Sequence, residues 1–118
     1  MIKARHAISD IRGVDFDSVE DIEYVEKALV DAADLLDLTI VEGPISHKFE
    51  PQGLTSIVLL STSHISVHTY PELGIVKCDA FSCGMECPSR AIEFLAKAFK
   101  GDVKGMEIIE RGDIDVQQ

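Results

Sequence analysis

The segment of residues 61–70, STSHISVHTY, combines hydroxyl and imidazole side chains in a run that is typical of a β-strand. Side chains alternate between the two faces of an extended strand. His64, Ser66 and His68 would therefore share one face, and Ser63 would lie on the other. Such a run is suited to nucleophilic or acid–base chemistry. A half-exposed strand with ordinary polar side chains is the alternative, and other residues must decide between the two.

Two cysteines lie where the last strand-like run gives way to a helix. Cys83 and Cys87 stand four residues apart, just before Pro88. A thiol close to the N-terminus of a helix is often reactive, whereas a thiol inside an apolar segment behaves as a small hydrophobic side chain. Cys83 and Cys87 are therefore candidates for chemistry, and Cys78, inside IVKCDAF, is expected to be buried.

These histidines and cysteines also form a nitrogen and sulfur set that zinc accepts. However, His64 and His68 lie about 13 Å apart if the strand is regular, which is too far for one ion. We therefore expect no metal. A Ser-His-Asp hydrolase is poorly supported because the sequence has no G-x-S-x-G motif. A Cys-His nucleophile pair stays open.

Composition narrows the class of protein. The 118 residues fit one domain, and the formal charge of −10, from 21 acidic and 11 basic residues, argues against nucleic acid as a partner. No apolar segment approaches the length of a membrane span, and the N-terminal residues do not read as a secretion signal. Three cysteines fit free thiols in a reducing compartment. We expect a cytoplasmic protein that binds a small-molecule substrate, and no membrane.

The periodicity of apolar residues predicts an α+β fold. A first strand is expected near residues 3–14, a helix over 15–37, a second helix that opens at Pro88 and stops at Gly101, and a closing strand over 103–111. Asp17 is the expected N-terminal cap of the first helix. Four strand-like runs lie between the helices, at 38–49, 53–63, 64–70 and 75–83, and residues 57–60 read as buried on both faces.

The element order β-α-β-β-β-β-α-β indicates an antiparallel sheet with two helices packed on one face. The other face would be left bare. We therefore expect a homodimer that buries sheet against sheet.

The segment TSHISVHTYPELGIVKCDAFSCG, residues 62–84, resembles the signature of the small prokaryotic S-adenosylmethionine decarboxylase proenzymes. These belong to a pyruvoyl-dependent family that serves spermidine synthesis. RHAISDIRGV resembles the first strand of the family, KFEPQGLTSIVLLSTSH the strand that leads to its processing site, and CPSRAIEFLAKAF its second helix. The likeness covers most of the chain.

The resemblance implies that the chain cleaves itself. The hydroxyl of Ser63 would attack the carbonyl of Thr62, and loss of the α-proton of residue 63 would then split the single domain into chains 1–62 and 63–118. Ser63 would become a pyruvoyl group at the new N-terminus. His68 is carried over as the base that assists the elimination, and Thr55, together with Ser56, as the hydroxyls that support the ester.

The resemblance also implies roles in turnover. The pyruvoyl ketone would form a Schiff base with the substrate's amine and accept electrons as carbon dioxide leaves. Cys83 would then donate a proton, with Cys87 as its rival for this role. Glu72 would accept hydrogen bonds from the ribose, and Phe49 and Tyr70 would flank the adenine.

One position departs from the family. The family usually has Glu before the converted serine, and here Thr62 stands there. The reaction uses the carbonyl of this residue, so cleavage stays possible, although a β-branched residue stiffens the backbone. Two alternatives stay open: an arginine or ornithine decarboxylase of the same family, or an uncleaved, non-catalytic homologue.

Overall fold

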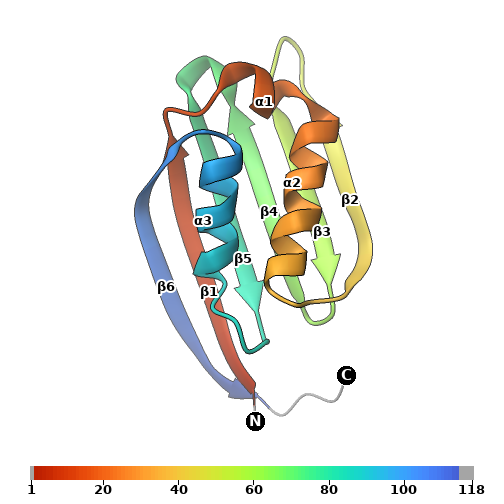
Figure 1. Cartoon of the computed structure of the whole chain (residues 1–118), viewed down its shortest axis with the longest axis vertical. Helices are drawn as coiled ribbons and strands as arrows, with labels where there is room; N and C mark the ends of the chain where they lie inside the picture. The colour runs from red at the N-terminus through yellow and green to blue at the C-terminus, as the bar shows by residue number, and fades with distance from the viewer. Residues whose placement is uncertain (1, 115–118) are drawn as a thin grey trace.

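In the part of the chain that the structure describes, six strands form one antiparallel sheet, and every helix lies on the same side of it (Figure 1). The computed structural model describes residues 2–114. The spatial order of the strands is β2-β3-β4-β5-β1-β6. Their bounds are β1 Ile2–Arg12, β2 Ile40–Lys48, β3 Leu54–Leu60, β4 Ser63–Tyr70, β5 Ile75–Ser82 and β6 Asp102–Ile114. The expected α+β class, with two main helices on one face of an antiparallel sheet, is confirmed.

The first helical region is divided in two, which the sequence analysis did not anticipate. Helix α1, Phe16–Glu20, begins after Asp15, and α2, Ile22–Leu35, begins after Asp21. Each of these aspartates accepts a hydrogen bond from a backbone N–H in the first turn, which is the standard role of an N-cap carboxylate. The prediction that Asp17 caps the helix was wrong, because two capping sites exist and Asp17 lies inside the first turn of α1.

The last helix, α3, spans Ser89–Ala98, with Pro88 at its N-cap. It ends through Lys100, which has a positive φ of 61°, and not through Gly101. Gly101 is needed for another reason: a Cβ there would lie 2.8 Å from the carbonyl oxygen of Arg12 and from side-chain atoms of Ile11 and Val14. The glycine therefore allows the chain to pass close to β1 as it leaves α3.

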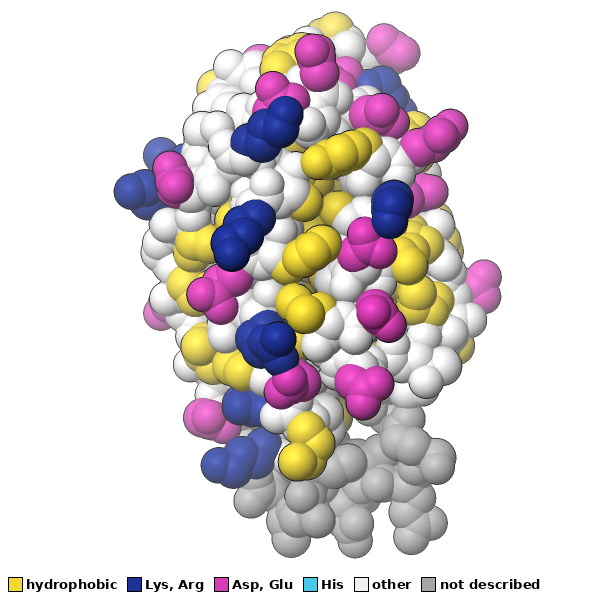
Figure 2. Space-filling model, viewed as in Figure 1, with side chains coloured by type: hydrophobic (Ala, Val, Ile, Leu, Met, Phe, Trp, Pro, Cys, Tyr) yellow, Lys and Arg dark blue, Asp and Glu magenta, His cyan; other side chains and the backbone are white. Residues whose placement is uncertain are grey.

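The hydrophobic core lies between the sheet and helices α2 and α3. Helix α2 packs over β2, β3 and β4, while α3 packs over β1, β5 and β6. The largest fully buried side chains include Phe99, Ile11, Leu29, Leu36, Leu54, Ile65, Ile92 and Leu95. Seen from the helix side, acidic and basic side chains are mixed over the surface, with hydrophobic side chains between the helices (Figure 2).

On the opposite face of the sheet, no helix is formed by residues 2–114, and we call it the open face. Cross-strand partners share a face, so the register identifies its members. They include Thr55, Ile57 and Leu59 of β3, His64, Ser66 and His68 of β4, Lys77, Asp79 and Phe81 of β5, and His6, Ile8 and Asp10 of β1. The expected alternation along β4 is confirmed, since Ser63, Ile65 and Val67 are buried on the helix side.

The expectation that residues 57–60 are buried on both faces was wrong. Val58 and Leu60 are buried, but Leu59 is 41% exposed. In β3 only one face meets the helices, so the apolar run marks a strand with a covered face and an open face.

Among residues 2–114, each helix is too short or too polar to cross a bilayer.

Candidate active site

The tip of the β3–β4 hairpin joins three residues, Thr62, Ser63 and Cys83, which we call the tip cluster. Leu60 pairs with Ser63, so residues 61 and 62 form the turn. The end of β5 brings Cys83 beside this turn. Its backbone N–H donates to Ser63 Oγ at 3.2 Å, and its thiol donates to the carbonyl oxygen of Thr62 at 3.5 Å. Cys83 therefore contacts both the hydroxyl and the carbonyl on either side of the 62–63 peptide bond.

Thr62 has an unusual backbone conformation for its residue type. Its φ is 54°, in the left-handed region, where a β-branched residue is a clear outlier. Its hydroxyl donates to the carbonyl oxygen of Ser61 at 2.7 Å. Such a conformation costs on the order of 1–3 kcal/mol and persists only where the surrounding structure holds it. The strain lies directly before the peptide bond that the sequence analysis expects to break.

A second group of predicted residues meets at the other end of the hairpin. Five of them line one cavity of about 300 Å³, which we call the strand-end cavity. These five are Phe49, Thr55, His68, Tyr70 and Glu72. Thr55 Oγ1 and His68 Nδ1 lie 3.0 Å apart, within hydrogen-bonding distance. Phe49 and Tyr70 are 47% and 41% exposed, so both residues are accessible to a ligand.

Glu20 fixes the loop that carries Phe49. Its carboxylate accepts from the backbone N–H of Gly53 at 2.6 Å and from Lys48 Nζ at 2.5 Å. Burial opposes ionisation of this carboxyl, but the bonds from Lys48 and Gly53 outweigh it and lower the pKa of Glu20. At the next residue, Leu54 N–H donates to Thr69 Oγ1 at 2.9 Å. These bonds hold the floor of the strand-end cavity.

The structure does not bring His68 to Ser63 within one chain. The two residues are five positions apart on β4, about 17 Å along a regular strand, and their side chains leave opposite faces. The tip cluster and the strand-end cavity are therefore two separate groups in the protomer.

The remaining candidates have other surroundings. Ser56 is fully buried on the helix side, where its hydroxyl lies 2.7 Å from that of Ser46, so it does not join Thr55. Cys87 accepts a hydrogen bond from Ser89 Oγ at 3.2 Å and is not the thiol that contacts Ser63. Cys78 is buried, as expected, and burial raises the pKa of its thiol to about 12, with help from the negative charges of Asp79 and Asp10.

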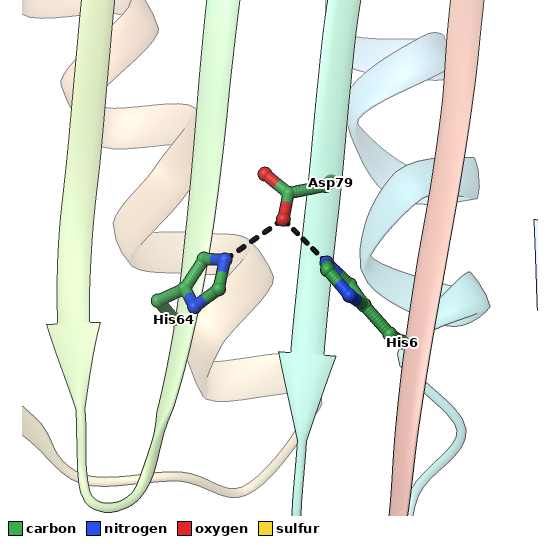
Figure 3. A group of neighbouring side chains, drawn as sticks. All are labelled: His6, His64 and Asp79. Atoms are coloured by element: carbon green, nitrogen blue, oxygen red, sulfur yellow. Dashed lines mark hydrogen bonds and ion pairs between the residues drawn. The ribbon is translucent and has the colours of Figure 1, made fainter. Parts of the chain in front are cut away.

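A cluster that the sequence analysis missed lies on the open face near the tip. His6, His64 and Asp79 come from three adjacent strands and point toward one another (Figure 3). Burial opposes ionisation of Asp79, but hydrogen bonds from His64, Ser66 and His6 hold its pKa well below the usual range. His64 also lines a cavity of about 420 Å³ with Thr62, Ser63 and Phe81. The alternation along residues 63–70 already marked His64 as a candidate for chemistry. Its proximity to His6, however, depends on the order of the strands in the sheet.

Comparison with known proteins agrees with this geometry. Residues 5–112 match the family model described as S-adenosylmethionine decarboxylase. The S-adenosylmethionine decarboxylase proenzyme of Anoxybacillus flavithermus is 37% identical, over 97% of this chain and 93% of the relative. That of Moorella thermoacetica is 40% identical, over 97% and 91%. The crystal structure of the adenosylmethionine decarboxylase from Aquifex aeolicus superposes with a TM-score of 0.84 at 28% identity, covering 99% of this chain and 97% of that one.

The fold and the tip cluster define a small α+β domain with a hydroxyl and a thiol at a strained hairpin turn. The chain belongs to the S-adenosylmethionine decarboxylase family.

Proposed function

We propose that this protein decarboxylates S-adenosylmethionine, to give the aminopropyl donor for spermidine synthesis, by means of a pyruvoyl group made from its own Ser63. Family membership supports the reaction class. The observation that carries the residue assignment is the double contact of Cys83 with Ser63 Oγ and with the Thr62 carbonyl. The three cysteines are free thiols, which fits the cytoplasmic setting expected from the sequence.

Self-cleavage begins at the tip cluster. Ser63 Oγ attacks the carbonyl carbon of Thr62, the amide C–N bond breaks, and an ester and a free amine form at residue 63. The thiol of Cys83 donates to the carbonyl oxygen, where negative charge develops during the attack. The strain at Thr62 is released as the turn opens, which favours the ester.

The second stage separates the chains. Removal of the α-proton of residue 63 expels the carboxylate of Thr62, leaving residues 1–62 and a dehydroalanine at residue 63. Water then replaces its nitrogen, ammonia leaves, and the pyruvoyl group remains. His68 is the base assigned to the proton removal, and Thr55 holds its imidazole through the contact with Nδ1.

His68 of the same chain lies too far from Ser63 for this role, so we propose a homodimer. The open faces of two protomers would pack antiparallel, sheet on sheet. This places the tip cluster of one protomer beside the strand-end cavity of its partner. Exposed apolar side chains on the open face, such as Ile45 and Leu59, would be buried in the same step.

The strand-end cavity suits the nucleoside part of the substrate. Phe49 and Tyr70 offer aromatic faces for adenine, and Glu72 offers an acceptor for ribose hydroxyls. The aromatic and acidic surroundings also suit the cationic sulfonium. The pyruvoyl group supplies an electron sink for the leaving carboxylate. Cys83, which already lies against residue 63, then supplies the proton to the α-carbon.

Two measurements test the proposal. The intact mass of the purified protein should show two chains that correspond to residues 1–62 and 63–118, the second with a pyruvoyl end, and Ser63→Ala should give one unbroken chain. Carbon dioxide should be released from S-adenosylmethionine and not from arginine or ornithine. A single wild-type chain of full length would contradict self-cleavage, and release from arginine or ornithine alone would overturn the substrate.

A further inference from the structure

Three side chains on the open face converge on one point. His6 on β1 and His64 on β4 flank the central strand β5, which carries Asp79 between them (Figure 3). His6 Nε2 lies 2.6 Å from Asp79 Oδ2, and His64 Nε2 lies 2.8 Å from the same oxygen. One potential metal-ligand atom from each residue lies within 4.8 Å of the other two. Two imidazole nitrogens and one carboxylate oxygen are thus gathered without any contribution from the tip cluster.

We propose that His6, His64 and Asp79 form a binding site for a divalent transition-metal ion such as zinc. Zinc binds histidine nitrogens and carboxylate oxygens at about 2.0–2.2 Å, so the ligand atoms of a tetrahedral site lie about 3.3 Å apart. Small rotations of the two rings away from the carboxylate would reach this spacing. Three protein ligands leave the fourth position open to water or another ligand.

The surroundings hold the three ligands in place. Ser66 donates to Asp79 Oδ1, the oxygen that neither histidine contacts, and so orients the carboxylate from behind. Phe81 packs against both rings, with centroid distances of 5.7 Å to His6 and 6.2 Å to His64. Little reorganisation is therefore needed on binding, which favours affinity.

Charge also favours a cation. The side chains of His6, His64 and Asp79 are 22%, 32% and 24% exposed in the single chain. The proposed dimer covers this face, so a bound ion would lie between the two sheets. The carboxylate of Asp79 would supply negative charge to the bound ion. Mg²⁺ and Ca²⁺ prefer oxygen ligands, whereas a set of two nitrogens and one oxygen suits zinc, cobalt or nickel. This site departs from the sequence-based expectation of no metal, because strand order and register bring in His6 and Asp79.

The test uses untagged protein, prepared without metal-affinity resin, stripped with a chelator and titrated calorimetrically with ZnCl₂. We expect one zinc ion per chain and no binding of MgCl₂. His6→Ala and His64→Ala should each weaken zinc binding at least about tenfold, since changes outside the direct ligand shell already cost 10–100-fold. His47→Ala is the matched control, a histidine on the open face of β2 outside the cluster, and should bind zinc as the wild type does.

A second experiment uses Co²⁺ in place of zinc, because its absorption spectrum distinguishes this site from a site made by the cysteines. It also includes a near-isosteric variant, in case an alanine variant fails to fold. Co²⁺ bound by nitrogen and oxygen absorbs in the visible range without the thiolate charge-transfer band that a Cys83 or Cys87 site would give. The near-isosteric Asp79→Asn should lose most of this signal while its circular dichroism is retained. Failure to bind zinc, binding unchanged in His6→Ala and His64→Ala, or a thiolate band at one equivalent would overturn the proposal. The uncleaved Ser63→Ala chain should bind zinc normally, so this result is independent of the proposed reaction.

Discussion

The thiol of Cys83 donates to the carbonyl oxygen of Thr62 at 3.5 Å, across the hairpin turn from the end of β5. This carbonyl is the one that an acyl shift at Ser63 would attack. The family resemblance assigns Cys83 to proton donation during turnover. Its position also suits it to assist the proposed cleavage, which would come before turnover. In the proposed mechanism the two roles separate in time, because cleavage would occur once per chain and turnover would occur repeatedly afterwards.

Cys83→Ala should therefore slow self-cleavage about tenfold, the effect of losing one neutral hydrogen bond of about 1.4 kcal/mol, and should nearly abolish decarboxylation. The backbone N–H that donates to Ser63 Oγ remains in this variant, so cleavage should not stop. Conversion is followed by denaturing gel after synthesis in a cell-free system. Cys83→Ser is the control: its hydroxyl restores the donor, so cleavage should recover while turnover stays low. Cleavage in Cys83→Ala at the wild-type rate would show that the thiol has no part in the first stage.

The positive φ of Thr62 makes the uncleaved chain less stable beside the peptide bond that is proposed to break. Thr62→Gly removes this strain, because glycine adopts left-handed φ without cost. We expect cleavage to slow about tenfold, if the released strain is of the order of 1.4 kcal/mol. Thr62→Val keeps the β-branched shape but lacks the hydroxyl that bonds Ser61, so it separates the strain from the hydrogen bond and should cleave close to the wild-type rate. Faster cleavage in the glycine variant would refute a role for strain.

The distance of about 17 Å between Ser63 and His68 along β4 leads to a complementation experiment. Ser63→Ala and His68→Ala chains should each fail to cleave efficiently when they are expressed alone. When they are co-expressed, a mixed dimer contains one complete site, made from Ser63 of the His68→Ala chain and His68 of the other. We expect the His68→Ala chain to be cleaved and the Ser63→Ala chain to stay whole, which chain-specific masses would show. Absence of cleavage in purified mixed dimers would place the whole reaction within one protomer.

The sequence predicted elements whose signals are local. Alternation along residues 63–70 gave the two faces of β4 correctly, and Pro88 marked the start of α3 within one residue. Ser56 obeys the same alternation: adjacent strand residues face opposite sides, so Thr55 and Ser56 lie on different faces of β3 and not in one site. Its contact with Ser46 on the helix side follows from that alternation.

The joining of distant residues was harder to predict. Strand β1 lies between β5 and β6, and this position brings His6 beside Asp79, 73 residues later in the sequence. No spacing in the sequence encodes that register, because it depends on how the whole sheet assembles. The family resemblance gave Ser63 and His68 a shared reaction, but it did not give the distance between them, which the regular path of β4 sets.

Cys78 provides a prediction about stability that does not depend on the reaction. Burial, together with the charges of Asp79 and Asp10, raises the pKa of its thiol from an ordinary value of 9.0 to about 12. The unfolded chain therefore loses this proton near pH 9, while the folded chain keeps it until about pH 12. The free energy of unfolding should fall across this window by up to about 1.4 kcal/mol per pH unit because of this one group.

Cys78→Ala removes that dependence. In the uncleaved Ser63→Ala background, urea unfolding at pH 8 should show the alanine variant less stable by about 1–2 kcal/mol, because a buried side chain has been shortened. At pH 10.5 the difference should shrink or reverse, because only the parent now loses stability through the thiol. Val76→Ala, a fully buried position on the same strand with no titratable group, should cost the same at both pH values. If the Cys78→Ala difference is equally constant, the thiol of Cys78 titrates in the folded protein as it does in the unfolded chain.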